Sequence, residues 1–482
     1  MIGLPGKPGL SPASWVTVQT VYTQGFGVAV FALQAPLLGP RAFGLVAIVM
    51  VFIGFCEALL DQGTEVLVSV REIEPAHYAT MNAVTGLLGL ALGVVLLLAS
   101  GPLASSFHEP QLASVAKAMA ILPLLAGIGC APNAQTRRAM EFKPLAIRMI
   151  SGVTAGGVVG VALTLLGAGV WALVWQAILQ RFIGAFVLWI NSPLAFQVRL
   201  SRSHWRDLSL FVWPLLVSRI MTWLSSQLPR FILALHLTVA ELGLFSLAAR
   251  LSDILVQVAV VPKAAVARVD LRRFTAGSAG LIDAVSRMLL TMSILCFGLC
   301  AVGAVLVPTL FRVWLDPKWS GAIVPSEVLI LSAGAWVSFY GSGVLFLALN
   351  QQRREALMSV VQSSTILLTA WFFSRWGLVD ASVAMAIRPL LLIPLAVFLV
   401  KTYAHVPIRA FLGAQGPALA GALASGGLVW MLRTPAENAF GNGIALLVLG
   451  AVGMLTYVLV LSLLAPDNVR RLVLQRAGIN RE

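Results

Sequence analysis

Charged residues are scarce in this chain. Of its 482 residues only 11% are Asp, Glu, Lys or Arg, whereas 59% are hydrophobic, and the mean hydropathy is +0.92. Soluble globular proteins carry about 25% charged residues, so this composition excludes a soluble domain as the main body of the chain. The composition is typical of a membrane protein.

Cysteine and histidine are also sparse, and neither forms a recognisable site. The four cysteines lie in or near apolar segments and form no CxxC pair, so we expect them to be packing residues. None of the five histidines has a neighbour at the spacing of a metal site. We therefore expect neither a metal nor a cofactor.

The sequence lacks the signatures of ATP-driven transport and of membrane enzymes. It contains no GxxxxGK[ST] loop to hold the phosphates of a nucleotide. The connections expected on the outer side are short and carry mostly Gly, Pro and isolated charges, with no paired acids or Ser and His together. The sequence thus favours a carrier over an enzyme.

Apolar stretches of about 20 residues, the length of a transmembrane helix, recur from one end to the other. Transmembrane strands are shorter and alternate in polarity, whereas a stretch such as "GLLGLALGVVLLLAS" is apolar on every side. We therefore predict an all-α polytopic bundle of about 14 transmembrane helices. The predicted segments are 14–37, 43–67, 80–101, 113–134, 147–167, 170–191, 208–234, 243–262, 284–308, 323–349, 356–375, 380–400, 412–432 and 442–465.

Basic residues concentrate in every second connection, as expected of cytoplasmic loops. If the N-terminus lies inside, 22 basic residues fall in inner segments and 6 in outer connections, which places both termini in the cytoplasm. This bias, together with arginines inside the spans, accounts for most of the net charge of +14. Nucleic acid is therefore not expected as a partner.

Similar turns recur at similar offsets along the chain. "LLGPRAFGLVAIVMVF" and "HLTVAELGLFSLAARL" place Gly44 and Gly243 199 positions apart, and "LGAGVWALVWQAILQRF" and "RWGLVDASVAMAIRPLL" place Gly169 and Gly377 208 positions apart. One explanation is an internal repeat, and the alternative is that turn residues recur by chance. We predict two parallel six-helix halves, 1–205 and 206–405, followed by two additional helices and a cytoplasmic tail in 406–482.

Several of these stretches together resemble one transporter family. The chain resembles the polysaccharide transporter (PST, Wzx-like) branch of the multidrug/oligosaccharidyl-lipid/polysaccharide (MOP) flippase superfamily, whose fold is MATE-like. The resemblance is carried by "LLGPRAFGLVAIVMVFIGF" at 37–55 with Asp61, "FHEPQLASVAKAMAIL" at 107–122, "RRAMEFKPLA" at 137–146, "GAGVWALVWQ" at 167–176, "WPLLVSRIMTWLSSQL" at 213–228 and "ELGLFSLAARL" at 241–251.

The resemblance implies a flippase of the bacterial cytoplasmic membrane. Such a protein moves undecaprenyl-diphosphate-linked oligosaccharide across the membrane by alternating access and feeds the assembly of exopolysaccharide, capsule or O-antigen. Its partners would be this substrate and membrane lipid, and a polysaccharide polymerase and export machinery are further candidate partners. A cation-coupled multidrug or small-molecule exporter of the same superfamily is the alternative.

Five arginines inside the predicted spans suit an anionic cargo, since guanidinium groups bind phosphate well. Arg181 and Arg219 lie nearest the middle of the membrane, where an unpaired arginine is costly. Arg230 lies near the outer end and could instead extend to the membrane surface. Asp253 is a further candidate for coupling or gating. Arg250 could instead pair with Asp253, three residues away, in a purely structural role, and Arg388 could tie its helix to a neighbour.

Three carboxylates follow one another in "FCEALLDQGTEVL". Glu57, Asp61 and Glu65 fall at i, i+4 and i+8 and thus line one face of a helix. Asp61 matches the acidic position of the family and is placed at the inner gate by the resemblance. Glu57 is the candidate for proton coupling, and Glu65 is expected at a solvated helix end. Carboxylates near a helix C-terminus oppose its dipole, so cationic neighbours are expected.

Overall fold

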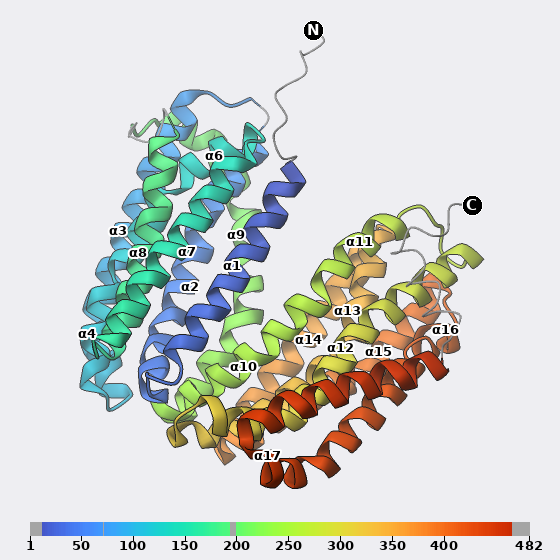
Figure 1. The fold of residues 1–482 in the computed structure, drawn as a ribbon. Helices are drawn as coiled ribbons and strands as arrows, with labels where there is room; N and C mark the ends of the chain where they lie inside the picture. The colour runs from blue at the N-terminus through green and yellow to red at the C-terminus, as the bar shows by residue number, and fades with distance from the viewer. Residues whose placement is uncertain (1–11, 71, 193–198, 465–482) are drawn as a thin grey trace. The chain divides into compact units, whose positions relative to one another are not determined.

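The chain folds into long helices joined by short turns (Figure 1). The computed structural model describes residues 12–70, 72–192 and 199–464, and no strand occurs in these ranges. The chain divides into two compact units, Met1–Gly243 and Leu244–Glu482. The first unit contains α1 Pro12–Gln34, α2 Pro40–Ser69, α3 Pro75–Ser106, α4 Pro110–Met119, α5 Ile121–Ile128, α6 Cys130–Arg138, α7 Phe142–Leu165, α8 Val170–Ile190 and α9 Arg202–His236.

The second unit begins within α10, which runs from Val239 to Ala259. It continues with α11 Val261–Leu271, α12 Ala279–Trp314, α13 Ile323–Ala348, α14 Gln352–Phe373, α15 Leu378–Leu399, α16 Ile408–Gly413 and α17 Gly416–Leu464. Short 3₁₀ turns at Pro317–Ala322 and Ser374–Trp376 and a π turn at Val400–Ala404 join these helices.

The predicted polytopic helical architecture is confirmed. Among the described residues, 12 helical stretches are long and apolar enough to cross a membrane. The last of them, Ile408–Leu464, includes α17, whose backbone turns at Gly441 (φ 74°), so it contains the last two predicted segments. The 35-residue α9 covers the predicted segment 208–234. If Ile408–Leu464 is counted as two membrane-crossing helices and α9 is added to the 12 stretches, the described residues contain about 14 such helices, as predicted.

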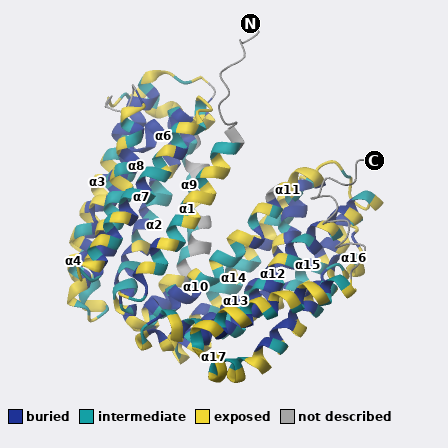
Figure 2. Ribbon diagram, in the orientation of Figure 1, coloured by how far each residue is buried: buried dark blue, intermediate teal, exposed yellow. Residues whose placement is uncertain are grey.

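Exposed residues, drawn in yellow, alternate with buried ones along the helices of both units (Figure 2). Many of the exposed residues are large and apolar. Leu98 is 74% exposed, Leu166 80% and Leu447 75%. Water would disfavour such surfaces, whereas lipid chains are as apolar as leucine. The chain is a multi-pass membrane protein.

The predicted fourth segment is one apolar stretch but folds as three short helices. Pro123 and Pro132 cannot donate a backbone hydrogen bond to the residue four positions earlier. Those residues are Met119 and Ile128, the last residues of α4 and α5. The carbonyl of Ile128 accepts a hydrogen bond from the indole N–H of Trp189 on α8 instead (3.2 Å).

The glycines that revealed the repeat occupy equivalent positions in the fold. Gly169 and Gly377 directly precede α8 and α15 with positive φ values of 59° and 113°. Gly44 and Gly243 are each the fifth residue of a helix, α2 and α10. A Cβ on Gly44 would lie 1.8 Å from the Val239 carbonyl oxygen, and one on Gly243 would lie 1.8 Å from that of Pro40. The two helix starts therefore cross in backbone contact.

In the first unit α2 is packed against α3, α5, α6, α8 and α9. One buried cluster joins Leu67 of α2, Met81 of α3, Ala134 of α6 and Leu208 of α9. Because α9 packs against α2 and α3, the first compact unit extends past residue 205 to Gly243. The predicted boundaries at 205 and 405 describe repeats rather than packing units and stay a prediction.

Candidate functional site

The carboxylates of α2 meet arginines from four other helices. Glu57, Asp61 and Glu65 follow one face of α2, as their spacing predicts. α2 packs against α6, α8 and α9, which carry Arg137, Arg181 and Arg219, and α7, which carries Arg148, packs against α6 and α8. We call these three carboxylates and four arginines the charge cluster.

Glu57 forms the shortest ion pair of the cluster. Its Oε1 lies 2.5 Å from Nη2 of Arg181, and the side chains are 23% and 43% exposed. An isolated charge at this depth in a membrane would be costly, and the pair reduces that cost. Arg181 nevertheless keeps enough exposed surface for another anion to reach it.

Glu65 is held by two arginines. Its Oε1 accepts hydrogen bonds from Nη2 of Arg219 (3.0 Å) and from Nη1 of Arg137 (3.4 Å). The sequence suggested a solvated helix end at this position, but the Glu65 side chain is only one-third exposed. α2 continues to Ser69, one turn further, so Glu65 lies inside the helix where its neighbours reach it.

Arg137 and Arg148 are members of the charge cluster that were not among the site residues predicted from the sequence. α7 begins at Phe142, so Arg148 lies within the helix. α7 approaches α8 closely through Gly152 and Gly156, where a Cβ would lie 2.6 Å from backbone oxygens of α8. This small-xxx-small spacing is typical of close helix contacts in membranes and was the signal available in the sequence.

A small polar cavity lies inside the charge cluster. Its volume is about 40 Å³, and Glu57, Asp61, Arg148 and Arg181 line it together with Thr64 and Asn133. This space accommodates a few water molecules but no sugar or lipid. The four arginines exceed the three carboxylates by one positive charge, so the cluster as a whole favours an anion.

The other predicted charged residues lie elsewhere. Arg230 is exposed on α9, where its Nη1 reaches Oε1 of Gln227 at 3.5 Å. Arg250 and Asp253 are both exposed on α10, in the second unit. None of the three lines the small cavity of the charge cluster. Their assignment to substrate binding or gating stays a prediction.

Arg388 is buried in the second unit. It is 5% exposed, and its Nε and Nη1 have no hydrogen-bond partner among the described residues. Its guanidinium carbon lies 4.9 Å from the ring centroid of Trp336 on α13, a cation–π contact. Trp336 in turn lines a cavity of about 290 Å³ with Phe339, Tyr340 and residues of α14. Binding of cargo by Arg388 itself stays a prediction.

The second unit also contains a much larger cavity, of about 1040 Å³, between α10, α11 and α12. Lys263, Arg273 and Arg287 line it with Asp270, and most of the remaining lining is apolar, including Val258 and Leu295. These cations are among the 22 basic residues that indicated orientation in the sequence, and no site was predicted from them. Their arrangement beside an apolar wall is suited to an amphiphile with an anionic group.

Comparison with known proteins identifies relatives in polysaccharide assembly. The family described as "Polysaccharide biosynthesis protein" matches residues 33–324, more than half of the chain. The succinoglycan biosynthesis transport protein ExoT of Rhizobium meliloti (strain 1021) is 27% identical over 244 residues, which is 50% of this chain and 49% of ExoT. The lipopolysaccharide biosynthesis protein WzxC of Escherichia coli (strain K12) is 25% identical over 179 residues, 37% of this chain and 36% of WzxC. These alignments span at most about half the length of either relative.

Two solved structures share the fold. The lipid II flippase MurJ in an inward closed conformation matches with a TM-score of 0.74 and 12% identity, covering 95% of this chain and 99% of MurJ. An inward-facing multidrug resistance MATE family transporter of the MOP superfamily matches with a TM-score of 0.55 and 15% identity, covering 86% and 96%. The family match confirms the family resemblance seen in the sequence, and the structural matches confirm the predicted MATE-like fold: the chain belongs to the family described as "Polysaccharide biosynthesis protein".

Proposed function

We propose that this protein is a flippase that moves undecaprenyl-diphosphate-linked oligosaccharide repeat units across the bacterial cytoplasmic membrane. The observation that carries the proposal is the charge cluster, in which arginines outnumber carboxylates inside membrane-spanning helices. Family membership and the transport role named for ExoT support the same cargo class. In this proposal the protein is a carrier and not an enzyme.

The charge cluster suits transient binding of a diphosphate. Arg181 and Arg219 are each held by one carboxylate and keep 43% and 44% of their side chains exposed. A diphosphate can compete with Glu57 and Glu65 for these guanidinium groups, because both ligands offer paired oxygens. The cavity of about 40 Å³ is too small for the cargo itself, so the exchange occurs on the exposed side of the arginines.

Replacement of Glu57 by cargo at Arg181 also offers a way to couple transport to proton movement. When cargo takes Arg181, Glu57 loses its closest cation, and binding of a proton would neutralise the carboxylate that is left. Asp61, the family position, lines the same cavity and would act at the inner gate. Coupling of transport to a cation gradient thus belongs to the proposal.

The cytoplasmic placement of both termini follows from the positions of the basic residues. Cargo would then be loaded from the inner leaflet and released on the outer one. A polymerase and export machinery would act on the released repeat units. The predicted alternative, a cation-coupled multidrug exporter, would prefer acidic and aromatic surfaces for cationic drugs, and the excess of arginine argues against it.

A deletion strain tests the proposal. Loss of the protein should stop surface polysaccharide and cause lipid-linked repeat units to accumulate on the inner leaflet, measured by accessibility of the glycan to an external enzyme or lectin in right-side-out vesicles. Tolerance to cationic drugs should not change. Altered drug tolerance with normal surface polysaccharide would instead identify an exporter.

Replacing Arg219 with alanine should reduce polymer export at least tenfold while leaving the protein level normal. Folding is spared because Glu65 keeps Arg137 as a partner. Export is measured as surface polysaccharide per cell, and the protein is quantified by immunoblot of the membrane fraction. Arg202→Ala, an exposed arginine at the start of the same helix, is the matched control. Unchanged export in Arg219→Ala would remove this residue from the cargo path.

A further inference from the structure

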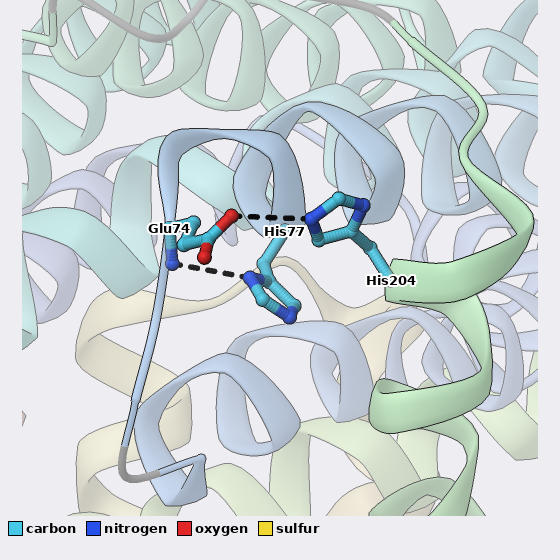
Figure 3. Close-up of side chains that lie close together, drawn as sticks. All are labelled: Glu74, His77 and His204. Atoms are coloured by element: carbon cyan, nitrogen blue, oxygen red, sulfur yellow. Dashed lines mark hydrogen bonds and ion pairs between the residues drawn. The ribbon is translucent and has the colours of Figure 1, made fainter.

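Two histidines that are far apart in the sequence meet at one end of the first unit. His77 lies in the first turn of α3 and His204 in the first turn of α9, and their rings form a T-shaped contact with centroids 4.6 Å apart. The side chain of Glu74, which directly precedes α3, lies beside both rings (Figure 3). Each of the three residues offers one ligand atom, and these atoms all lie within 4.8 Å of one another.

We propose that Glu74, His77 and His204 form a binding site for a divalent transition metal ion, with Zn²⁺ the best fit. Two imidazoles and one carboxylate are ligands that zinc prefers, and three protein ligands leave a fourth position for water. Magnesium and calcium prefer sites built from oxygen alone. The proposal is independent of the transported cargo.

The geometry is close to that of a bound state. Tetrahedral ligands at the usual zinc distances lie about 3.4 Å from one another. Oε2 of Glu74 and Nε2 of His204 are already 3.3 Å apart. All three ligand atoms lie within 4.8 Å of one another, so the ring of His77 must approach the other two by at most about 1.4 Å to complete the set.

Both histidines also have partners on the ring nitrogen that faces away from the proposed ion. Nδ1 of His204 lies 2.6 Å from Oγ of Ser201, which leaves Nε2 toward Glu74. Nε2 of His77 lies 3.9 Å from Oδ2 of Asp207, which leaves Nδ1 on the side of Glu74. Metal-binding histidines usually donate their second N–H to such a carboxylate or oxygen.

Metal binding would replace two existing hydrogen bonds, and one of them joins Nε2 of His204 to Oε2 of Glu74 (3.3 Å). Nδ1 of His77 accepts a hydrogen bond from the backbone N–H of Glu74 at 3.1 Å, an interaction that caps α3. The ion would take the place of this donor at Nδ1. The N-terminus of α3 would then be held by the metal through Glu74 and His77.

The site would fasten α9 to α3. The same region is already joined by a hydrogen bond from the backbone N–H of Arg199 to the Ala79 carbonyl (3.4 Å) and by packing of Leu208 against Tyr78. α9 carries Arg219 of the charge cluster. A metal at its first turn would therefore fix the helix that supplies one of the cluster's cations.

Zinc binding to the full-length protein tests the proposal. The protein is purified in detergent without a histidine tag, stripped with a chelator and dialysed against ZnCl₂, with MgCl₂ as a parallel sample. We expect one zinc per chain by elemental analysis and a higher midpoint of thermal unfolding with zinc, and no change with magnesium. Zinc binding below one equivalent, or an unchanged midpoint, would overturn the site.

Variants separate this site from incidental zinc binding. His204→Gln should weaken zinc binding at least 100-fold, and Asp207→Asn should weaken it about 10- to 100-fold. His204 is only partly buried at the start of its helix, so folding should survive, which size-exclusion chromatography checks. His236→Gln, at the far end of α9, is the matched control and should bind like the wild type. Equal zinc affinity in His204→Gln would contradict the proposal.

Discussion

An Arg181→Ala protein should lose polymer export almost completely, while its free energy of unfolding falls by about 1–3 kcal/mol. The substitution removes the cation nearest to Glu57 and leaves that carboxylate inside a membrane-spanning helix beside a cavity of about 40 Å³. The proposed cargo loses a guanidinium group at the same time. Export is measured as surface polysaccharide and stability by thermal unfolding in detergent.

Two further variants distinguish these contributions. Glu57→Gln combined with Arg181→Ala removes both charges, so stability should recover while export stays low. Arg41→Ala breaks another Arg–Glu ion pair of the first unit, with Glu109 at the start of α4, and should leave export unchanged. If the double variant exports normally, Arg181 serves only to neutralise Glu57 and does not contact cargo.

Gly44→Ala should destabilise the protein strongly, by about 3 kcal/mol or more, and should leave little protein in the membrane. The added methyl carbon would lie 1.8 Å from the Val239 carbonyl oxygen, and a backbone atom cannot move aside as a side chain can. The start of α10 would therefore have to separate from α2. Thermal unfolding and the amount of membrane-inserted protein measure this effect.

Gly25→Ala is the matched control for this prediction. Gly25 also lies in a membrane helix, but a Cβ there would meet no atom within 4 Å. Because alanine favours helix more than glycine does, this variant should be as stable as the wild type or slightly more stable. Equal stability of the Gly44→Ala and Gly25→Ala proteins would contradict the prediction, because it would show that the starts of α2 and α10 can move apart without loss of stability.

The fold was largely predictable from the sequence because the length of the apolar segments is the dominant signal. Apolar length defines membrane helices almost independently of their neighbours, and the predicted segment 170–191 differs from α8, Val170–Ile190, by a single residue. The break of the fourth segment depended on Pro123 and Pro132, whose effect on the helix is local and could have been recognised. The apolar pattern alone does not reveal this break in the helix.

The candidate site was predictable only in part. The spacing of Glu57, Asp61 and Glu65 predicted one face of a helix and a need for cations, but not which arginines would meet that face. Arg148 and Arg137 join that face through the packing of α6 and α7. The spacing of Gly152 and Gly156 indicates a close helix contact but does not identify the helix that makes it. The same dependence on packing holds for His77 and His204, which are 127 positions apart and meet only because α9 packs against α3.

The backbone contact between the starts of α2 and α10 also constrains which substitutions the protein can accept during evolution. Gly44 and Gly243 each face a backbone oxygen, of Val239 and of Pro40, so no substitution at those neighbours could make room for a larger residue. A larger residue at either glycine therefore cannot be accommodated by a second substitution at the residue whose oxygen it would meet. The same constraint thus acts twice, once in each half of the predicted repeat.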